Sequence, residues 1–97
     1  MTVPLSCEQI TVALRGLDGW QRDDNVLLRE FKFGSFREAV SFIVRIAFAA
    51  EAVNHHPELW NVYSTVRVRL TTHDAGDRIS QRDVDLAGEI NAISWVS

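Results

Sequence analysis

The sequence predicts an α+β fold, a two-layer sandwich in which a four-stranded antiparallel sheet carries helices on one face. Two observations indicate this class. Segments with helical and strand-like periodicity alternate, and the order helix, strand, strand occurs twice before a final helix. An antiparallel sheet with its helices gathered on one face accommodates this α-β-β-α-β-β-α order. A chain of 97 residues has room for one hydrophobic core, so we expect a single domain over residues 1–97.

The first helix is predicted by a capping box. Ser6 and Gln9 have the spacing at which each side chain can bind the other residue's free backbone N–H. Apolar residues then recur at helical intervals until Gly16 and Gly19 weaken the pattern. The helix should therefore end near Arg15.

A β-hairpin is expected next. A short strand lies around Trp20, a polar turn covers residues 21–25, and the segment VLLREFKF follows. Phe31 and Phe33 fall on one face of this longer strand, because side chains alternate between the two faces of a sheet.

The second helix is the longest predicted element. Ser35 and Glu38 have capping-box spacing at its start, and Pro57 should stop it because proline lacks an N–H. Its apolar residues form two neighbouring stripes, one of Phe36, Val40, Ile43, Ala47 and Ala50 and the other of Phe42, Ile46, Ala49 and Val53. So wide an apolar arc indicates burial on more than one side. A central helix and a subunit interface explain it equally well.

Two further strands and a last helix complete the pattern. The segment WNVYSTVRVRLTT is rich in β-branched and aromatic residues, with apolar positions alternating against Arg67 and Arg69. Because it is longer than a usual strand, we expect it to fold back near Ser64 and Thr65. A polar connection follows at residues 74–78, and the spacing of Ser80 and Asp83 predicts the start of the final helix.

Composition excludes several classes of protein. A formal net charge of −3 offers no basic surface, so nucleic acid is not an expected direct ligand. The single cysteine, Cys7, cannot form an internal disulfide, and the N-terminal segment lacks the pattern of a secretory signal, which favours a cytoplasmic location. No apolar run approaches the roughly 20 residues that cross a bilayer, so no membrane association is expected.

The candidate chemistry lies in the segment from Glu51 to His73, which contains every histidine of the chain. Glu51 and His55 are four residues apart, so both would project from one side of the last helical turn if the helix continued to its proline. His56 follows directly, and His73 lies at the end of a later strand. Histidine exchanges protons near neutral pH, so these groups suit acid–base chemistry.

Structural or metal-binding roles would account for the same residues. A helix C-terminus favours histidine, so His55 and His56 could be capping residues, while Asp83 is already accounted for by its place in a capping box. Three histidines can form a zinc site, but the sequence has neither HExxH nor a cysteine pair, and we expect no metal. Trp60 and Tyr63 could stack on a flat ring, although aromatic residues on strands usually belong to the core.

Several motifs together resemble the pterin-4a-carbinolamine dehydratase family. They are Glu51-x3-His55-His56-Pro57, Trp60-Asn61-Val62-Tyr63, Thr72-His73-Asp74-Ala75-Gly76 and Asp83. Positions such as Gly19-Trp20 and the Phe31-x-Phe33 strand extend the resemblance over nearly the whole chain. Asp77, Arg78 and Ile79 depart from the family pattern and add charge beside His73.

The resemblance implies a fold and an activity. Family members form α-β-β-α-β-β-α sandwiches, commonly assemble as dimers or as tetramers made from dimers, and convert 4a-hydroxytetrahydropterin to quinonoid dihydropterin without a cofactor. This dehydration recycles tetrahydrobiopterin after aromatic amino acid hydroxylation. The implied catalytic residues are His55, His56, His73 and Glu51, and the implied substrate-binding residues are His56, Pro57, Trp60, Tyr63, Trp20 and Asp83.

The same resemblance carries an alternative function. Some relatives are binding proteins, among them a dimerisation cofactor for a homeodomain transcription factor and assembly factors for the carbon-fixing enzyme of autotrophic bacteria. A non-catalytic binding module of this fold is therefore the second hypothesis, with the strand face that bears Arg67 and Arg69 as its partner surface. Four titratable groups, Glu51 and the three histidines, favour catalysis, because a pure scaffold does not need them together.

Overall fold

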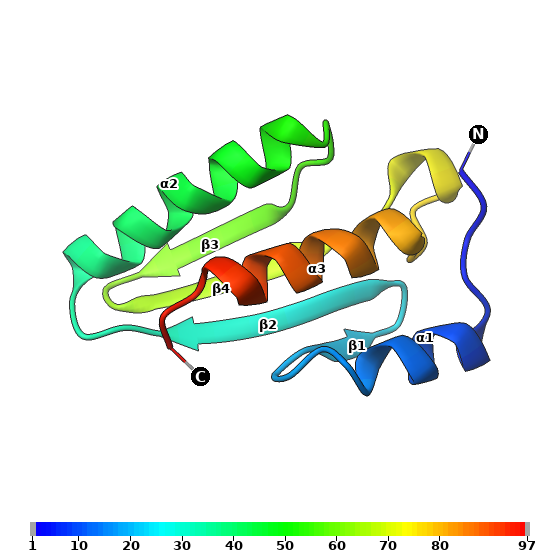
Figure 1. Ribbon diagram of the computed structural model, residues 1–97, viewed down its shortest axis with the longest axis horizontal. Coiled ribbons are helices and arrows are strands. Elements are labelled where there is room, and N and C mark those ends of the chain that lie inside the picture. Colours follow the sequence, from blue (N-terminus) through cyan, green and yellow to red (C-terminus); the bar gives the residue numbers. More distant parts are fainter. Residues whose placement is uncertain (1, 97) are drawn as a thin grey trace.

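The computed structural model describes residues 2–96 and shows helices packed on a four-stranded antiparallel sheet (Figure 1). In chain order, the elements are α1 (Cys7–Leu14), β1 (Gln21–Asp23), β2 (Val26–Lys32), α2 (Phe36–Ala52), β3 (Glu58–Val62), β4 (Thr65–Leu70), the short 3-10 helix η1 (His73–Ala75) and α3 (Gln81–Ile93). In Figure 1, α2 and α3 lie across the same face of the sheet. The predicted α+β sandwich and its element order are confirmed.

The strand order β1-β2-β4-β3 determines where the connecting segments meet. In the antiparallel pairing of β3 with β4, Glu58 at the start of β3 lies opposite Arg69 near the end of β4. The segment that leads from α2 into β3 and the segment that leads from β4 into η1 therefore leave the sheet at the same end. His55 and His56 lie in the first of these segments, and His73 begins η1 directly after the second.

The hydrophobic core lies between the sheet and the helices. Alternation along β4 buries Val66, Val68 and Leu70 completely, while Arg67 and Arg69 point to the opposite face. The core also contains residues from α1, β2, α2 and α3, namely Ile10, Leu27, Phe31, Ala39, Phe42, Ile46, Ala50, Leu86, Ala87 and Ile90. Phe31 and Phe42 pack with ring centroids 4.7 Å apart, which joins the sheet to α2.

The turn between β3 and β4 lies at Tyr63 and Ser64, one residue earlier than predicted. Tyr63 adopts a left-handed conformation with φ of 56°, which is uncommon for a residue with a side chain. The Asn61 side chain stabilises the turn by donating hydrogen bonds to the carbonyl oxygens of Tyr63 (3.2 Å) and Thr65 (2.9 Å). Because a side chain outside the turn stabilises it, the usual turn residues are not needed.

Two of the three predicted capping boxes form with both hydrogen bonds. They are Ser6 with Gln9 at α1 and Ser80 with Asp83 at α3. At α2, the Ser35 hydroxyl accepts the Glu38 N–H, which is one half of a capping box. The Glu38 carboxylate turns to other donors, and its Oε1 accepts the Trp95 indole N–H at 3.2 Å.

α2 buries one apolar stripe and exposes another. Ala39, Phe42, Ile46 and Ala50 face the core. Phe36, Val40, Val44 and Phe48 are exposed, so residues 2–96 pack against only one side of α2. The helix ends at Ala52, well before Pro57. No helix within residues 2–96 combines the length and apolar character that a membrane span requires.

Candidate active site

An open cavity of about 690 Å³ lies where the α2–β3 and β4–α3 connections meet. Its lining includes all three histidines, together with Val26, Asn54, Glu58, Thr71, Thr72, Asp74, Asp77 and Arg82. The volume falls within the usual range for small-molecule sites. The cavity therefore has both the size for a bicyclic ligand and proton-exchanging groups in its wall.

His55 is the buried histidine of the cavity, with 7% of its side chain exposed. Asn54 has a left-handed conformation (φ 49°), and the His55 N–H donates to the Ala50 carbonyl oxygen, which closes the end of α2. The following chain turns inward and brings His55 Nε2 to 2.6 Å from Asp83 Oδ1.

Asp83 is completely buried, and hydrogen bonds fix both of its carboxylate oxygens. Oδ2 accepts the Ser80 backbone N–H at 2.9 Å and the Thr72 hydroxyl at 2.7 Å, while Oδ1 lies against His55. Asp83, which caps the start of α3, thus also positions the imidazole ring of His55 just after the end of α2. When His55 donates its Nε2–H to this carboxylate, the neutral ring keeps Nδ1 as an acceptor.

His56 pairs with Glu51, and this corrects the expected partner of Glu51. Helical spacing suggested that Glu51 would lie beside His55, but α2 ends at Ala52 and the turn at Asn54 directs His55 inward. His56 Nε2 instead lies 3.0 Å from Glu51 Oε1. Both side chains are exposed, at 62% and 76%, so this pair lies at the solvent side of the cavity.

His73 pairs with Asp77, a residue that the sequence did not assign to the site. His73 lies in η1, and its Nδ1 hydrogen-bonds to the Asp77 carboxylate. Asp77 has a left-handed backbone with φ of 57°, which is uncommon for a residue other than glycine. Each histidine therefore has a carboxylate partner of its own, with Asp83, Glu51 and Asp77 serving His55, His56 and His73.

The remaining predicted site residues lie outside the cavity lining. Trp20 is buried in the core, and its indole N–H donates to Asn91 Oδ1 at 2.8 Å. Trp60 lies on the outer sheet face beneath the Arg67 guanidinium, whose central carbon is 4.3 Å from the ring centroid. Tyr63 is 79% exposed in the β3–β4 turn, and Pro57 is half-buried in the segment between α2 and β3. Their expected contacts with substrate stay predictions.

Arg82 is a cavity residue that the sequence did not indicate. Its guanidinium donates to the carbonyl oxygens of Asn54 (2.6 Å) and Val53 (3.3 Å). It therefore ties the first turn of α3 to the end of α2 and supports the turn that precedes His55. No local pattern signals this role, because both acceptors are backbone atoms far away in sequence.

A metal could be held only by a converging group of ligands. Among residues 2–96, no group of three or more histidine, cysteine or acidic side chains has that arrangement. The three imidazoles are instead paired individually with carboxylates, an arrangement that orients rings and favours proton transfer.

Comparison with known proteins identifies relatives over the whole domain. Residues 3–93 match the family model described as pterin 4 alpha carbinolamine dehydratase. A protein of Opitutus terrae, provisionally named a pterin-4-alpha-carbinolamine dehydratase, is 51% identical over 99% of both chains. A Prochlorococcus marinus protein with the same provisional name is 46% identical over 92% of both chains.

Solved structures show the same fold. The crystal structure of a transcriptional coactivator/pterin dehydratase from Brucella melitensis has a TM-score of 0.88 and 39% identity, covering 93% of this chain and 97% of that one. A pterin dehydratase-like protein, identified as a RuBisCO assembly factor in the alpha-carboxysome, has a TM-score of 0.65 and 20% identity, covering 80% and 89% of the two chains. The second likeness concerns the fold alone.

Proposed function

Because this chain belongs to the pterin 4 alpha carbinolamine dehydratase family, we propose that it dehydrates 4a-hydroxytetrahydropterin to quinonoid dihydropterin. The observation that carries the proposal is the cavity of about 690 Å³ with three imidazoles in its wall, each hydrogen-bonded to a different carboxylate. The reaction needs one proton delivered to oxygen and another removed from nitrogen. Paired imidazoles suit both transfers.

The chemistry has a defined proton balance. Hydroxide is a poor leaving group, so an acid protonates the 4a-oxygen as the C4a–O bond breaks and water departs. The lone pair of N5 forms the C4a=N5 double bond, and a base then accepts the N5 proton. No electron acceptor is needed, because the pterin loses a molecule of water and no hydride.

We assign the acid role to His55 and His73, which approach the ligand from different segments of the cavity wall. His55 would act as an imidazolium that donates its proton from Nδ1, because its Nε2–H is held by Asp83. His73 would act through Nε2, because Nδ1 is occupied by Asp77. A hydrogen bond at one ring nitrogen fixes the orientation of the imidazole, so the second nitrogen is directed toward the ligand. This lowers the entropic cost of orienting the acid during the reaction.

His56 and Glu51 would hold the pterin at the solvent side, with Pro57 setting the direction of His56. Asp83 would act through His55 and not by touching the substrate. Trp20, Trp60 and Tyr63 lie outside the cavity lining, so the proposal gives them no direct contact within this chain. The activity would serve tetrahydrobiopterin recycling in the cytoplasm, as the sequence suggested.

The test is the rate of carbinolamine dehydration by His55→Ala and His73→Ala variants. Each should lose roughly 100-fold in rate, a typical contribution of a positioned acid. Thr11→Ala, an exposed change on α1 outside the cavity lining, is the matched control and should keep full activity. Wild-type rates in both histidine variants would remove the assignment.

A non-catalytic binding module remains the second candidate, because the Brucella melitensis relative carries the description of a coactivator as well as of a dehydratase. The two arginines of the expected partner surface already form ion pairs with acidic residues of neighbouring strands, so they are less available to a partner. Arg67 lies 3.0 Å from Glu30, and Arg69 lies 3.7 Å from Glu58. A stoichiometric partner lost on charge reversal at both arginines, together with no dehydratase activity, would favour this candidate.

A further inference from the structure

Arg29 is a buried cation that lies outside the candidate active site. Its side chain is 7% exposed, because it lies on the core face of β2 between Leu27 and Phe31. Burial lowers the pKa of the guanidinium and the Asp18 carboxylate partly offsets this, but an arginine stays charged near neutral pH. No carboxylate of residues 2–96 lies within ion-pair distance of Arg29. The fold therefore buries a positive charge without a direct counter-charge, which is unfavourable.

Two neighbouring groups stack on the Arg29 guanidinium. The ring centroid of Phe31 lies 4.2 Å from the central carbon, Cζ. A Cβ on Gly19 would lie 2.5 Å from Nε, 2.7 Å from Cζ and 2.9 Å from Cδ, so the Gly19 backbone approaches the flat side of the group. Because these contacts cover the guanidinium plane, a ligand can reach Arg29 only at the edge of that plane.

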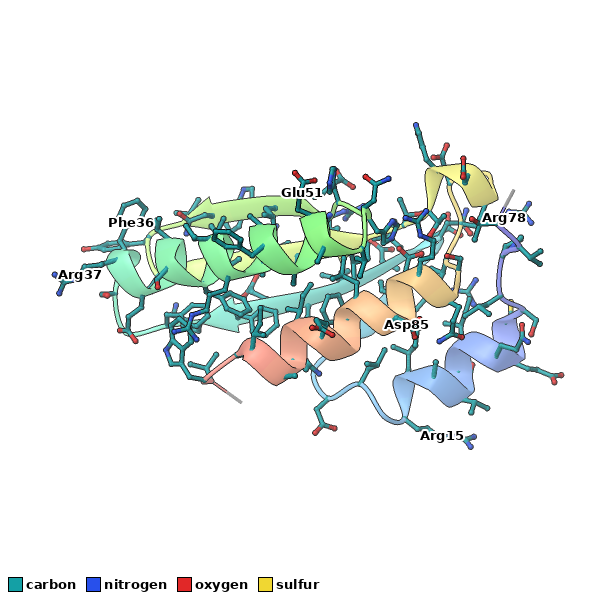
Figure 2. The ribbon with its side chains drawn as sticks, turned by 45° about the horizontal axis from the view of Figure 1, so that its top comes forward. Arg15, Phe36, Arg37, Glu51, Arg78 and Asp85 are labelled. Atoms are coloured by element: carbon teal, nitrogen blue, oxygen red, sulfur yellow. The ribbon has the colours of Figure 1, made fainter. Side chains whose placement is uncertain are left out.

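One edge of the guanidinium is already occupied by the protein. Nη1 donates to the Asp18 carbonyl oxygen and to Asn91 Oδ1, both at 2.7 Å. Asn91 is itself fixed, since Oδ1 also accepts the Trp20 indole N–H at 2.8 Å and Nδ2 donates to the Asp18 carbonyl oxygen at 3.1 Å. In Figure 2, the chain that follows Arg15 leaves the end of α1 and passes beside α3, where these bonds form. The orientation of Arg29 is therefore set before any ligand binds.

The other edge of Arg29, formed by Nε and Nη2, has no acceptor among residues 2–96. In that part of the chain, every side-chain nitrogen that is sealed from solvent has a hydrogen-bond partner. The unpaired Nε and Nη2 are therefore open to the cavity that Arg29 lines, which has a volume of about 380 Å³. Two parallel N–H groups on one edge are the arrangement that binds a carboxylate through both of its oxygens.

The lining of this second cavity selects the kind of anion. Its residues are Asp18, Gly19, Arg29, Glu30, Asn91 and Val96, and none of them lines the candidate active site. One negative charge on a ligand would neutralise the guanidinium, whereas a second would be repelled by the two acidic side chains. A planar group also fits the covered guanidinium better than a tetrahedral one. These conditions describe a monocarboxylate.

We propose that Arg29 anchors a second ligand site, which binds a small monocarboxylate through Nε and Nη2. The cavity is larger than a carboxylate group alone, so it has room for the body of a small organic acid beside the charged end. The proposal does not depend on the dehydratase activity, because the two cavities share no lining residue.

NMR titration of the full chain with sodium acetate tests the site at constant ionic strength. Acetate should shift the Nε–H signal of Arg29 and the indole N–H signal of Trp20 in a saturable way. We expect a dissociation constant of roughly 1–10 mM for a single charge-assisted, bidentate contact. Sodium chloride should give no saturable shift, and sodium sulfate should bind at least roughly tenfold more weakly than acetate because it is divalent and tetrahedral.

Arg29→Lys tests the fork, because lysine keeps the charge but cannot make the bidentate contact. Acetate should bind at least roughly tenfold more weakly, as read from the Trp20 indole signal. Arg22→Lys changes an exposed arginine outside the cavity lining, so this matched control should bind acetate as the wild type does. Circular dichroism checks that both variants fold.

Asp18→Asn tests the same site without altering the fork. The variant keeps the backbone carbonyl that accepts from Arg29 Nη1 and removes a negative charge from the cavity. Acetate should therefore bind roughly two- to threefold more tightly at low salt. Asp24→Asn removes an exposed carboxylate outside the cavity lining and should leave the affinity unchanged. If Arg29→Lys does not fold, the comparison of these two variants decides.

The proposal would be overturned by an acetate titration without a saturable shift, or by chloride producing the same shift. Wild-type acetate binding by a folded Arg29→Lys variant would overturn it too. Sulfate that bound as tightly as acetate, or an unchanged acetate affinity in Asp18→Asn, would contradict the selection of a monocarboxylate by the cavity.

Discussion

Replacing Asp83 by asparagine is the sharpest perturbation of the site, because one carboxylate joins three segments of the chain. It accepts the Ser80 N–H at 2.9 Å and the Thr72 hydroxyl at 2.7 Å, and it lies 2.6 Å from His55 Nε2. An asparagine oxygen can keep the first two bonds. Its amide group, a donor, would then face His55.

The magnitude follows from the bond that is lost. A buried hydrogen bond to a charged group contributes about 1.5–3 kcal/mol, so Asp83→Asn should reduce the free energy of unfolding by about 2 kcal/mol. For a domain of this size, that corresponds to a fall in Tm of roughly 10 °C. Urea denaturation followed by circular dichroism measures the first value, and thermal melting measures the second.

Asp83→Asn should also change the chemistry of His55. With an amide donor against Nε2, the neutral ring must carry its proton on Nδ1, the nitrogen that we assign to the ligand. The acid form of His55 carries protons on both nitrogens, and in this variant its Nε2–H would meet an amide donor in place of the carboxylate that accepts it. The dehydration rate should therefore fall at least roughly tenfold while the protein stays folded. Nitrogen NMR shifts should report the exchanged tautomer of His55, a signature that a merely structural role would not produce.

Asp85→Asn is the matched control for this experiment. Asp85 lies on the same helix, is exposed, and accepts a hydrogen bond from the Gln81 side chain at 2.8 Å. Its replacement should change stability by less than about 0.5 kcal/mol. If Asp83→Asn matched the wild type in stability, rate and tautomer, the reasoning about the buried network would be refuted.

Two further predictions concern backbone positions with positive φ. Gly19→Ala should lower the free energy of unfolding by about 2 kcal/mol, because φ is +82° and the new Cβ would lie 2.5 Å from Arg29 Nε. Gly76→Ala should lower it by only about 1 kcal/mol, because φ is +72° but no atom lies within 4 Å of the new Cβ. Equal losses in urea denaturation would contradict this difference. Asp77→Gly should raise stability by up to about 1 kcal/mol, since φ is 57°, yet slow dehydration because His73 loses its acceptor. An unchanged rate would leave Asp77 without a role.

Much of the fold was predictable because its signals are local. Capping boxes at Ser6 and Ser80 and the alternation along β4 depend on residues within a few positions of one another. The end of α2 was not predictable in the same way. Pro57 stood out as a stop signal, but Asn54 ends the helix earlier by adopting a left-handed conformation, which asparagine tolerates better than most residues.

The sequence predicted that the histidines would lie near one another, but it did not predict the partner of each one. The three histidines do line one cavity. Their partners depend on how distant segments approach, since Asp83 is 28 residues from His55. Glu51 was expected beside His55 because helical spacing was extended past Ala52, where the helix stops. Because its place in the capping box already explained Asp83, nothing in the sequence indicated its second contact, with His55.

For the aromatic residues, the sequence indicates the chemistry of the side chains but not their location. Trp60 and Tyr63 have the chemistry to stack on a flat ring, but a strand places alternate side chains on opposite faces. Trp60 falls on the outer face beneath Arg67, and Tyr63 falls in a turn. Composition indicates what such side chains can do, while sheet register decides what they meet.

Stopped-flow absorbance of enzymatically generated 4a-carbinolamine, with and without catalytic amounts of this protein, tests the central claim most directly. We predict that dehydration accelerates in proportion to protein concentration and continues for many turnovers. A decay that is the same with and without the folded protein would show that the paired imidazoles do not perform this reaction.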